Sequence, residues 1–485
     1  MTPFLDQVAR HYFAEGEVER LCFIVPNRRA AVFFRKYLGQ CAARSGRPIL
    51  APAVFTMNDF FYALVGARQT DHVHLLLTLY DCYKPLYEAS GAQAEPLDDF
   101  IFWGGVLLSD FGDVDKYLVD PEQLFTNIAD FRALQDDFSY LEPEQVEAIR
   151  SFLSHFKTGG RYKEEFRRIW NILLPLYRDF HARLRERGMA TEGQVYRDLA
   201  EKLVGTPAVE LLQAHFAQVH KFVFVGLNAL NECEKRLMRR LRDARLAEFC
   251  WDYGPGWISD PHNKSSLFMA DNVQEFPQAF EPDPEGLPVP EISVLSVPSA
   301  VGQAKQIPAL LDGMGAGGIE TAVVLPDESL LIPVLNSLPE GIRDINVTMG
   351  YPMSGSSLSA LMDDVAALQL HLREKDGQWL FYHRQVWSIF SNSVFKTIAG
   401  PEGLEKAAAV RRQARYYIPQ SELSGLPVFD AVFQPVVKAP GAADPAAVRA
   451  VEDYQLELLS FLGVSLRNVP GMALEQDFAR EYYLA

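Results

Sequence analysis

Four residues with acid–base character stand close together in the stretch SDFGDVDKYL. Asp110, Asp113 and Asp115 precede Lys116. A metal-dependent nuclease uses carboxylates to hold a cation and a nearby lysine to steady the attacking water. That chemistry also needs a strand–turn–strand setting, whereas this stretch lies in an acidic segment with helical periodicity. We therefore expect solvated or helix-capping carboxylates here rather than a metal site.

Three other groupings fail on spacing or order. His72 and His74 are two residues apart, so on a helix their side chains point to different faces and do not form a metal pair. The glycines of GMGAGGIETAVVL follow a helical pattern and lead into a strand, which is the reverse of a dinucleotide loop. The serines of MSGSSLSAL lack the GxSxG nucleophile pattern. Ser356–Leu361 is instead typical of a helix start.

The requirements for ATP hydrolysis are missing in two places. No GxxxxGK[ST] motif occurs in the chain, so no loop supplies the backbone nest and lysine that hold a triphosphate. The apolar run 222–225 is where an ATPase strand would end in the acidic residues that bind magnesium. It is followed by Gly226 and Leu227. We expect neither a metal nor another cofactor in this chain.

Composition sets the class of protein. The 485 residues include 48% hydrophobic residues, which is enough for several folded domains. Five scattered cysteines form no CxxC pair, and no leader-like or membrane-length apolar segment occurs, so we expect a cytoplasmic protein without membrane contact. The formal net charge of −17 argues against a simple nucleic-acid coat, although a binding face needs only local positive potential.

Elements alternate in a way that predicts an α/β fold. Strands are expected at 21–25, within 48–55 and at 222–225, each followed by an amphipathic helix. Further strands are expected at 246–254, 292–298, 321–326 and 346–350. Such alternation favours doubly wound parallel sheets. We expect four regions: an α/β domain made of 1–70 with 204–254, a helical insertion at 71–203, a linker at 255–290, and a second α/β domain that begins the segment 291–485 and carries its own helical insertion.

Several of these elements together resemble a known family. The stretches FIVPNRRAAVFFRKYL, VFTMNDFFYALVG and FVFVGLNALNECEKRLMRRL are similar to successive elements of the AddB/RexB subunit of bacterial helicase–nucleases, in which an inactivated superfamily 1 helicase-like part precedes a PD-(D/E)XK nuclease. Further elements, such as ISVLSVPSAVGQAKQIPALL, resemble the opening of the second motor domain. The resemblance covers nearly the whole chain as a pattern of elements.

The resemblance implies a fold and a biological role. It implies two RecA-like domains without a P-loop, in a protein of DNA double-strand-break repair and recombination that works with a partner helicase–nuclease subunit on DNA ends or single strands. The exonuclease domain of such proteins binds Mg²⁺ and in some members an iron–sulfur cluster. This chain ends at FAREYYLA without a nuclease motif, so we expect the natural protein to continue.

The resemblance also points to residues that would meet nucleic acid. They are Arg28 and Arg29 in the first turn, Asn58 at the next helix start, and Phe60 or Phe61, one of which periodicity assigns to the core. A solvated helix start explains the arginine pair equally well. Two alternatives to DNA gripping stay open: a docking module for a partner helicase subunit with little DNA affinity, and a less favoured active ATPase with a degenerate site.

Overall fold

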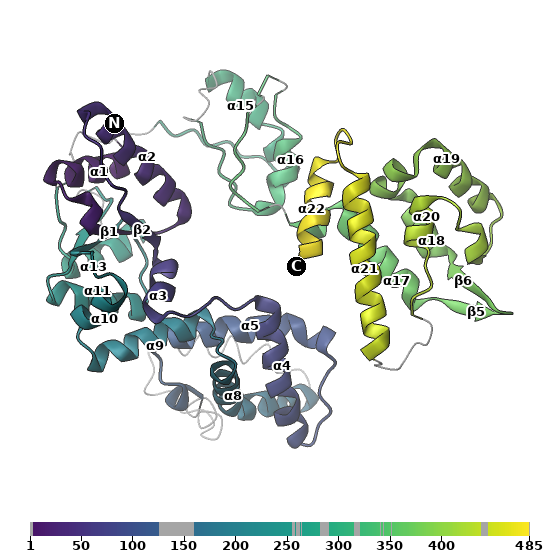
Figure 1. Cartoon of the computed structure of the whole chain (residues 1–485), viewed down its shortest axis with the longest axis horizontal. Helices are drawn as coiled ribbons and strands as arrows, with labels where there is room; N and C mark the ends of the chain where they lie inside the picture. Colours follow the sequence, from purple (N-terminus) through teal and green to yellow (C-terminus); the bar gives the residue numbers. More distant parts are fainter. Residues whose placement is uncertain are drawn as a thin grey trace. The chain divides into compact units, whose positions relative to one another are not determined.

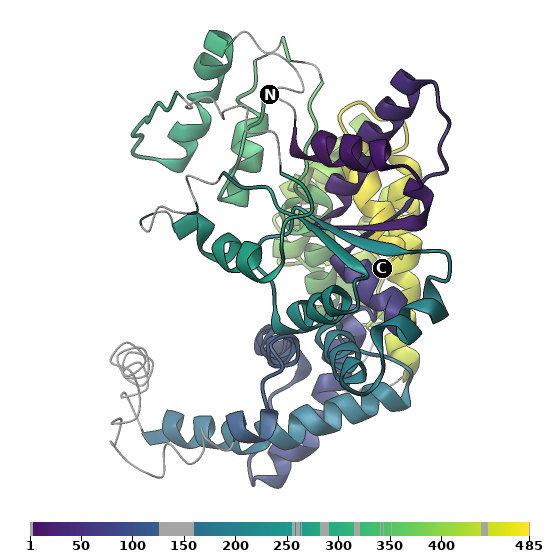
Figure 2. The same ribbon diagram turned by 90° about the vertical axis from the view of Figure 1, so that its left-hand side faces the viewer.

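The computed structural model describes residues 3–125, 160–254, 258, 262, 264–281, 291–314, 321–339, 341–342, 344–350, 352–437 and 445–484. The chain forms two compact units, residues 1–292 and 293–485. Figures 1 and 2 show the elements of each unit. The units are described separately below.

A parallel sheet of four strands forms the centre of the first unit. Its strands are β1 (Leu21–Val25), β2 (Ala53–Thr56), β3 (Lys221–Val225) and β4 (Ala247–Cys250), in the order β2-β1-β3-β4. β1 pairs with both β2 and β3, and β3 pairs with β4, all in parallel. The predicted α/β class and the parallel sheet are therefore confirmed for this unit.

Both faces of the sheet are buried, which explains the nearly continuous apolar character of its strands. Phe23 and Val25 point to one face and Cys22 and Ile24 to the other. The first face is covered by α1 (Phe4–Glu15) and α2 (Arg28–Ser45). The second face is covered by α3 (Met57–Val65), α9 (Glu192–Gly205), α10 (Ala208–His215), α11 (Glu232–Asp243) and α13 (Leu267–Glu275). Helices on both faces are the hallmark of a doubly wound sheet.

The predicted helical insertion has a hydrophobic core of its own. Its helices are α4 (His72–Ala89), α5 (Leu97–Lys116) and α8 (Gly160–Glu186). Large side chains such as Tyr83, Phe100 and Phe180 fill the space between them. α9, which we expected in the insertion, instead packs through Val195 and Leu199 into the core beneath the sheet. The predicted linker likewise contains α13, because Met269 and Phe276 are buried in that same core.

The second unit is mostly helical. Its longer helices are α15 (Ile307–Met314), α17 (Ser357–Leu370), α18 (His383–Ser391), α19 (Ser393–Arg412), α21 (Pro445–Ser465) and α22 (Ala473–Leu484). Short helices are α14 (Ala300–Ala304), α16 (Leu331–Leu335) and α20 (Pro427–Val432). An antiparallel sheet contains β5 (Arg373–Lys375), β6 (Gln378–Tyr382) and β7 (Tyr417–Pro419) in that order. Ser356 caps α17 as predicted, since its hydroxyl accepts from the Ser359 N–H at 3.0 Å.

A second parallel sheet is not seen in the described part of this unit. Residues 292–298, 321–326 and 346–350, which we expected as strands, show no strand pairing. Val294 and Val324 are 89% and 80% exposed, so the apolar pattern that predicted burial has no partner surface here. The expectation of two doubly wound domains is therefore met by one sheet only. Within the described residues, no helix is long and apolar enough to cross a membrane.

Candidate nucleic-acid interface at the carboxyl edge of the parallel sheet

The carboxyl ends of all four strands meet at one edge of the sheet. The chain leaves β1 toward β2 on one side and leaves β3 toward β4 on the other. The crossover helices α2 and α11 accordingly lie on opposite faces. Doubly wound proteins bind ligands outside the carboxyl ends of the strands, at such a switch point. The loops after β1 and β3 are therefore the first place to look for a site.

Two exposed arginines begin the helix that follows β1. The Asn27 side chain caps α2 by accepting from the Ala30 N–H at 2.9 Å, which places Arg28 and Arg29 in the first helical turn. Both are exposed, Arg28 at 88% of its side chain. The first turn of α2 contains no acidic residue. The positive end of the helix dipole thus adds to two cationic side chains, which is unfavourable until an anion binds there.

The start of α3 lies within reach of this pair. Thr56 is its cap, since its hydroxyl accepts from the Asp59 N–H at 3.1 Å. We had placed Asn58 at this helix start. Asn58 instead has a buried side-chain oxygen that has no hydrogen-bond partner among the described residues. Asp59 approaches the Arg28 guanidinium at 3.9 Å, and this weak exposed ion pair leaves Arg28 available to another anion.

The burial of Phe60 corrects our prediction that this ring meets nucleic acid. Both Phe60 and Phe61 are fully buried. Phe60 contacts the rings of Phe216 and Phe222, and Phe61 stacks on Tyr196 with ring centroids 3.9 Å apart. Periodicity had assigned only one of them to the core. A base therefore cannot stack on Phe60 in this structure, because the helix turns both rings toward the sheet.

The loop after β3 carries no carboxylate at the positions where an ATPase would hold magnesium. Gly226 has a φ of 65°, a left-handed conformation that favours glycine, and its N–H donates to the Cys250 carbonyl at 2.8 Å. Leu227 is buried. Backbone geometry and core packing account for both residues, so the side chains at these two positions cannot bind a metal.

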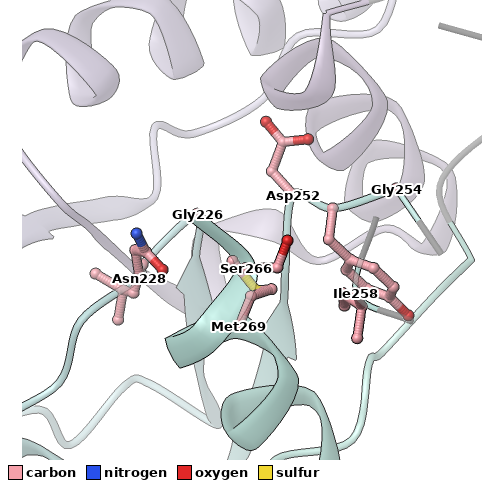
Figure 3. Close-up of a pocket in the computed structure, with 9 residues that line it drawn as sticks. Gly226, Asn228, Asp252, Gly254, Ile258, Ser266 and Met269 are labelled. Carbon is pink, nitrogen blue, oxygen red and sulfur yellow. The ribbon is translucent and has the colours of Figure 1, made fainter. Parts of the chain in front are cut away.

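A cavity of about 290 Å³ opens beside this loop at the ends of β3 and β4 (Figure 3). Its polar side chains include Asn228 and Asp252, and Ser266 and Met269 contribute from the segment that begins α13. Desolvation at the cavity wall raises the pKa of the Asp252 carboxyl. We had not singled out Asp252, although its place near the end of the predicted strand 246–254 was a usable signal.

The acidic stretch considered first is part of a packed helix. Asp110 and Asp113 are exposed on α5, as a solvated role requires. Asp115 differs, because it is completely buried and binds Arg197 of α9, with Nε 2.8 Å from its Oδ1. Burial raises the pKa of Asp115 to about 6, although the Tyr177 hydroxyl and Arg197 favour its charged form. This carboxylate is a structural ion-pair partner and is closed to a metal.

Two stretches rich in Lys and Arg, residues 235–245 and the second half of α8, form ion pairs with neighbouring carboxylates. In the run from Lys235, Lys235 pairs with Glu232 at 3.0 Å and Arg239 binds Glu275. In α8, Arg178 binds Glu122 and Arg185 pairs with Asp198 at 3.1 Å. Ion pairs of this kind are typical of solvated helix faces. By contrast, Arg29 makes no ion pair with any residue that the structure describes.

No group of three or more metal-ligating side chains occurs in the described ranges. The glycines of GMGAGGIETAVVL lie largely at 315–320, outside the described residues. No protein-family model matches the chain, and no curated protein matches it.

Proposed function

We propose that this chain is an inactivated motor module that grips DNA and scaffolds a nuclease in a helicase–nuclease of double-strand-break repair. The observation that carries the proposal is the pair of exposed arginines at the positive end of α2, at the switch point of a doubly wound sheet. At the same edge, Gly226 and Leu227 stand where a motor would need carboxylates. A sheet edge that lacks the residues for ATP hydrolysis but carries exposed cations suits the binding of nucleic-acid phosphates.

The finer parts of the proposal rest on the resemblance to AddB/RexB subunits. These parts are a pair of RecA-like domains, a PD-(D/E)XK exonuclease with Mg²⁺ and an iron–sulfur cluster beyond this chain, and a partner helicase–nuclease subunit. The helical insertion between β2 and β3 supports the comparison, because it interrupts the sheet at the place that the resemblance requires.

A second candidate function is a docking module for the partner subunit. One surface of α5 favours it: Phe102 and Val106 are 84% and 51% exposed, and their spacing of four residues puts them on one side of the helix. Asp98, Asp99 and Asp110 lie on the same helix. Together with the net charge of −17, this surface suits a partner protein whose binding face has apolar side chains at its centre and basic side chains around them.

A salt titration of DNA binding tests the first function. We expect the full chain to bind labelled duplex DNA with an affinity that falls steeply as salt rises. The double substitution of Arg28→Ala with Arg29→Ala should reduce the slope of log affinity against log salt by about 1.8, since each phosphate contact to duplex contributes about 0.9. Fluorescence anisotropy at several salt concentrations measures this slope.

The matched control removes the same charge from the other end of α2. Arg44 and Arg47 are exposed there, and alanine at both should leave the slope close to that of the wild type. An equal loss in both double variants would mean that only net charge matters. Absence of DNA affinity even at low salt would reject DNA gripping and leave the docking module.

A further inference from the structure

One face of the small antiparallel sheet in the second unit points away from the core. Phe381 on β6 pairs with Ile418 on β7, and both are buried. Because side chains alternate along a strand, their neighbours Tyr382 and Tyr417 lie on the opposite face, where the two are also paired in register. Neither tyrosine belongs to the hydrophobic core of this unit.

Other aromatic rings and an arginine lie in contact with this tyrosine pair on both of its sides. The ring centroids of Tyr382 and Tyr417 are 5.4 Å apart, and the Arg373 guanidinium lies 4.5 Å from the centre of the Tyr417 ring. On the other side, Tyr382 meets His383 at 4.7 Å and His383 meets Tyr416 at 5.2 Å.

The ring chain extends onto α18. His383 and Trp387 are four residues apart on that helix, with ring centroids 6.3 Å apart. Arg411 lies over the Trp387 ring at 5.4 Å. We name the connected set of Arg373, Tyr382, Trp387, Arg411, Tyr416 and Tyr417, joined through His383, the aromatic–arginine face. It is built from β5, β6, α18, the end of α19 and β7, most of which are labelled in Figure 1.

The residues around this face carry a net positive charge, whereas the whole chain is negative. Residues 371–417 contain eight Lys or Arg against four Asp or Glu, whereas the whole chain has a net charge of −17. Arg415 is neutralised by Glu422 at 2.6 Å. Arg384 and Arg412 are exposed and make no ion pair with a described residue. Arg384 precedes Trp387 by three residues, so the two share one side of α18.

We propose that the aromatic–arginine face binds single-stranded nucleic acid by stacking bases on its rings. Proteins that hold single strands combine aromatic platforms with a positively charged path for the backbone, and both are present here. Tyr416 is 74% exposed and offers the most open ring, while the arginines supply the charge. The inference rests on the proposed function for its nucleic-acid partner. It adds a second binding site, assigns that site to a single strand, and names the residues that contact the strand.

The chemistry of the face favours a single strand over a duplex or an acidic peptide. In a duplex the bases are already stacked and paired, so their faces are not available to a ring. An acidic peptide would use the arginines but would gain little from a run of tyrosine, histidine and tryptophan rings. Unstacked bases use both kinds of group at once.

The test compares affinities of the full chain for labelled oligothymidylate and for a duplex of equal length. We expect Tyr416→Ala to weaken single-strand binding by about tenfold, which is the size of one base–aromatic stacking contact. Tyr416→Phe keeps the ring and should retain the affinity. Tyr483→Ala removes an exposed tyrosine from α22 of the same unit and should have no effect. Duplex binding should change little in all three variants.

Two outcomes would overturn the inference. One is unchanged single-strand affinity in Tyr416→Ala and in Arg384→Ala with Arg412→Ala. The other is photo-crosslinking of a halogenated oligonucleotide to peptides of the first unit alone, with none from 379–387 or 413–420. If DNA binding then depends only on Arg28 and Arg29, the proposed function stands without this site. If the wild type binds no nucleic acid, both proposals fail.

Discussion

Alanine at Arg197 should lower the free energy of unfolding of the helical insertion by about 3–5 kcal/mol, because it leaves the Asp115 carboxylate buried without its cation. Asp115 is fully buried, and Arg197 Nε lies 2.8 Å from its Oδ1. The Arg197 Nη2 also donates to the Val114 and Val119 carbonyls at 2.8 and 2.7 Å. The Arg197 guanidinium therefore holds the C-terminal end of α5 against α9.

This ion pair also connects the insertion to the sheet domain. The Tyr177 hydroxyl of α8 donates to Asp115, and the Cys233 thiol of α11 donates to its backbone carbonyl at 3.4 Å. Side chains from three other helices thus bond to Asp115, two of them to its carboxylate and one to its backbone carbonyl. We expect the loss of Arg197 to loosen α5 and α9 together, which amide hydrogen exchange followed by mass spectrometry would detect as faster exchange in both helices.

The neighbouring residue provides a matched control. Lys116 follows Asp115 on α5 and pairs with Glu192 of α9 at 2.6 Å, but both of these side chains are partly exposed. A pair in contact with water contributes at most about 1 kcal/mol, so Lys116→Ala should change exchange much less than Arg197→Ala. Equal effects of the two substitutions would show that the burial of Asp115 is not what makes its pair important.

The sequence predicted those parts of the fold whose signal is local. The strand at 21–25 was predicted at its observed bounds because it is a short apolar run closed by Pro26. The helix starts at Asn27 and Thr56 follow ordinary capping preferences. The strands expected in 292–350 show the limit of such patterns, since an apolar run shows only that a segment can be buried. Whether a neighbouring strand is present is decided elsewhere in the chain.

The candidate site was predicted less completely for the same reason. Arg28 and Arg29 lie at the sheet edge because their strand and cap are encoded beside them. The burial of Phe60 depends on Phe216 and Phe222, more than a hundred residues away, and periodicity alone could not place both rings inside. Asp115 was read as one of three similar aspartates. Its distinct role depends on Arg197, which lies in a different helix.

Burial of the histidine beside Asp115 should make that histidine's own contribution to the stability of the insertion sensitive to acid. His181 is 5% exposed, and burial with the nearby Arg185 and Arg197 cations lowers its pKa from 6.5 to about 3. A group whose pKa is depressed in the folded state binds its proton more readily when unfolded. Its contribution to stability is complete above pH 6.5 and is lost as the pH falls toward 3. By pH 4.5 the expected loss is about 2–3 kcal/mol.

Asp115 opposes this effect in the wild type. Its pKa rises from 3.8 to about 6 on burial, so its folded form takes up a proton and gains stability as the pH falls from 6 to 3.8. The His181 Nε2 and the Asp115 Oδ2 are 3.5 Å apart, and neither atom has a hydrogen bond to a described residue. The changes in stability that the two titrations cause therefore largely cancel between pH 6 and pH 4. The effect of one group becomes measurable only when the other is removed.

Replacing His181 by phenylalanine separates the two contributions. We expect the variant to be less stable than the wild type at pH 7 and to recover relative to it by about 2–3 kcal/mol at pH 4.5, because only the unfolded wild type gains the extra proton. Amide exchange in α5, α8 and α9, compared between variant and wild type at each pH, measures the difference. His74→Phe is the control, since that imidazole is 70% exposed. A difference between His181→Phe and wild type that stays constant with pH would mean that His181 does not titrate on unfolding, and that the pH dependence of this cluster must come from Asp115 alone.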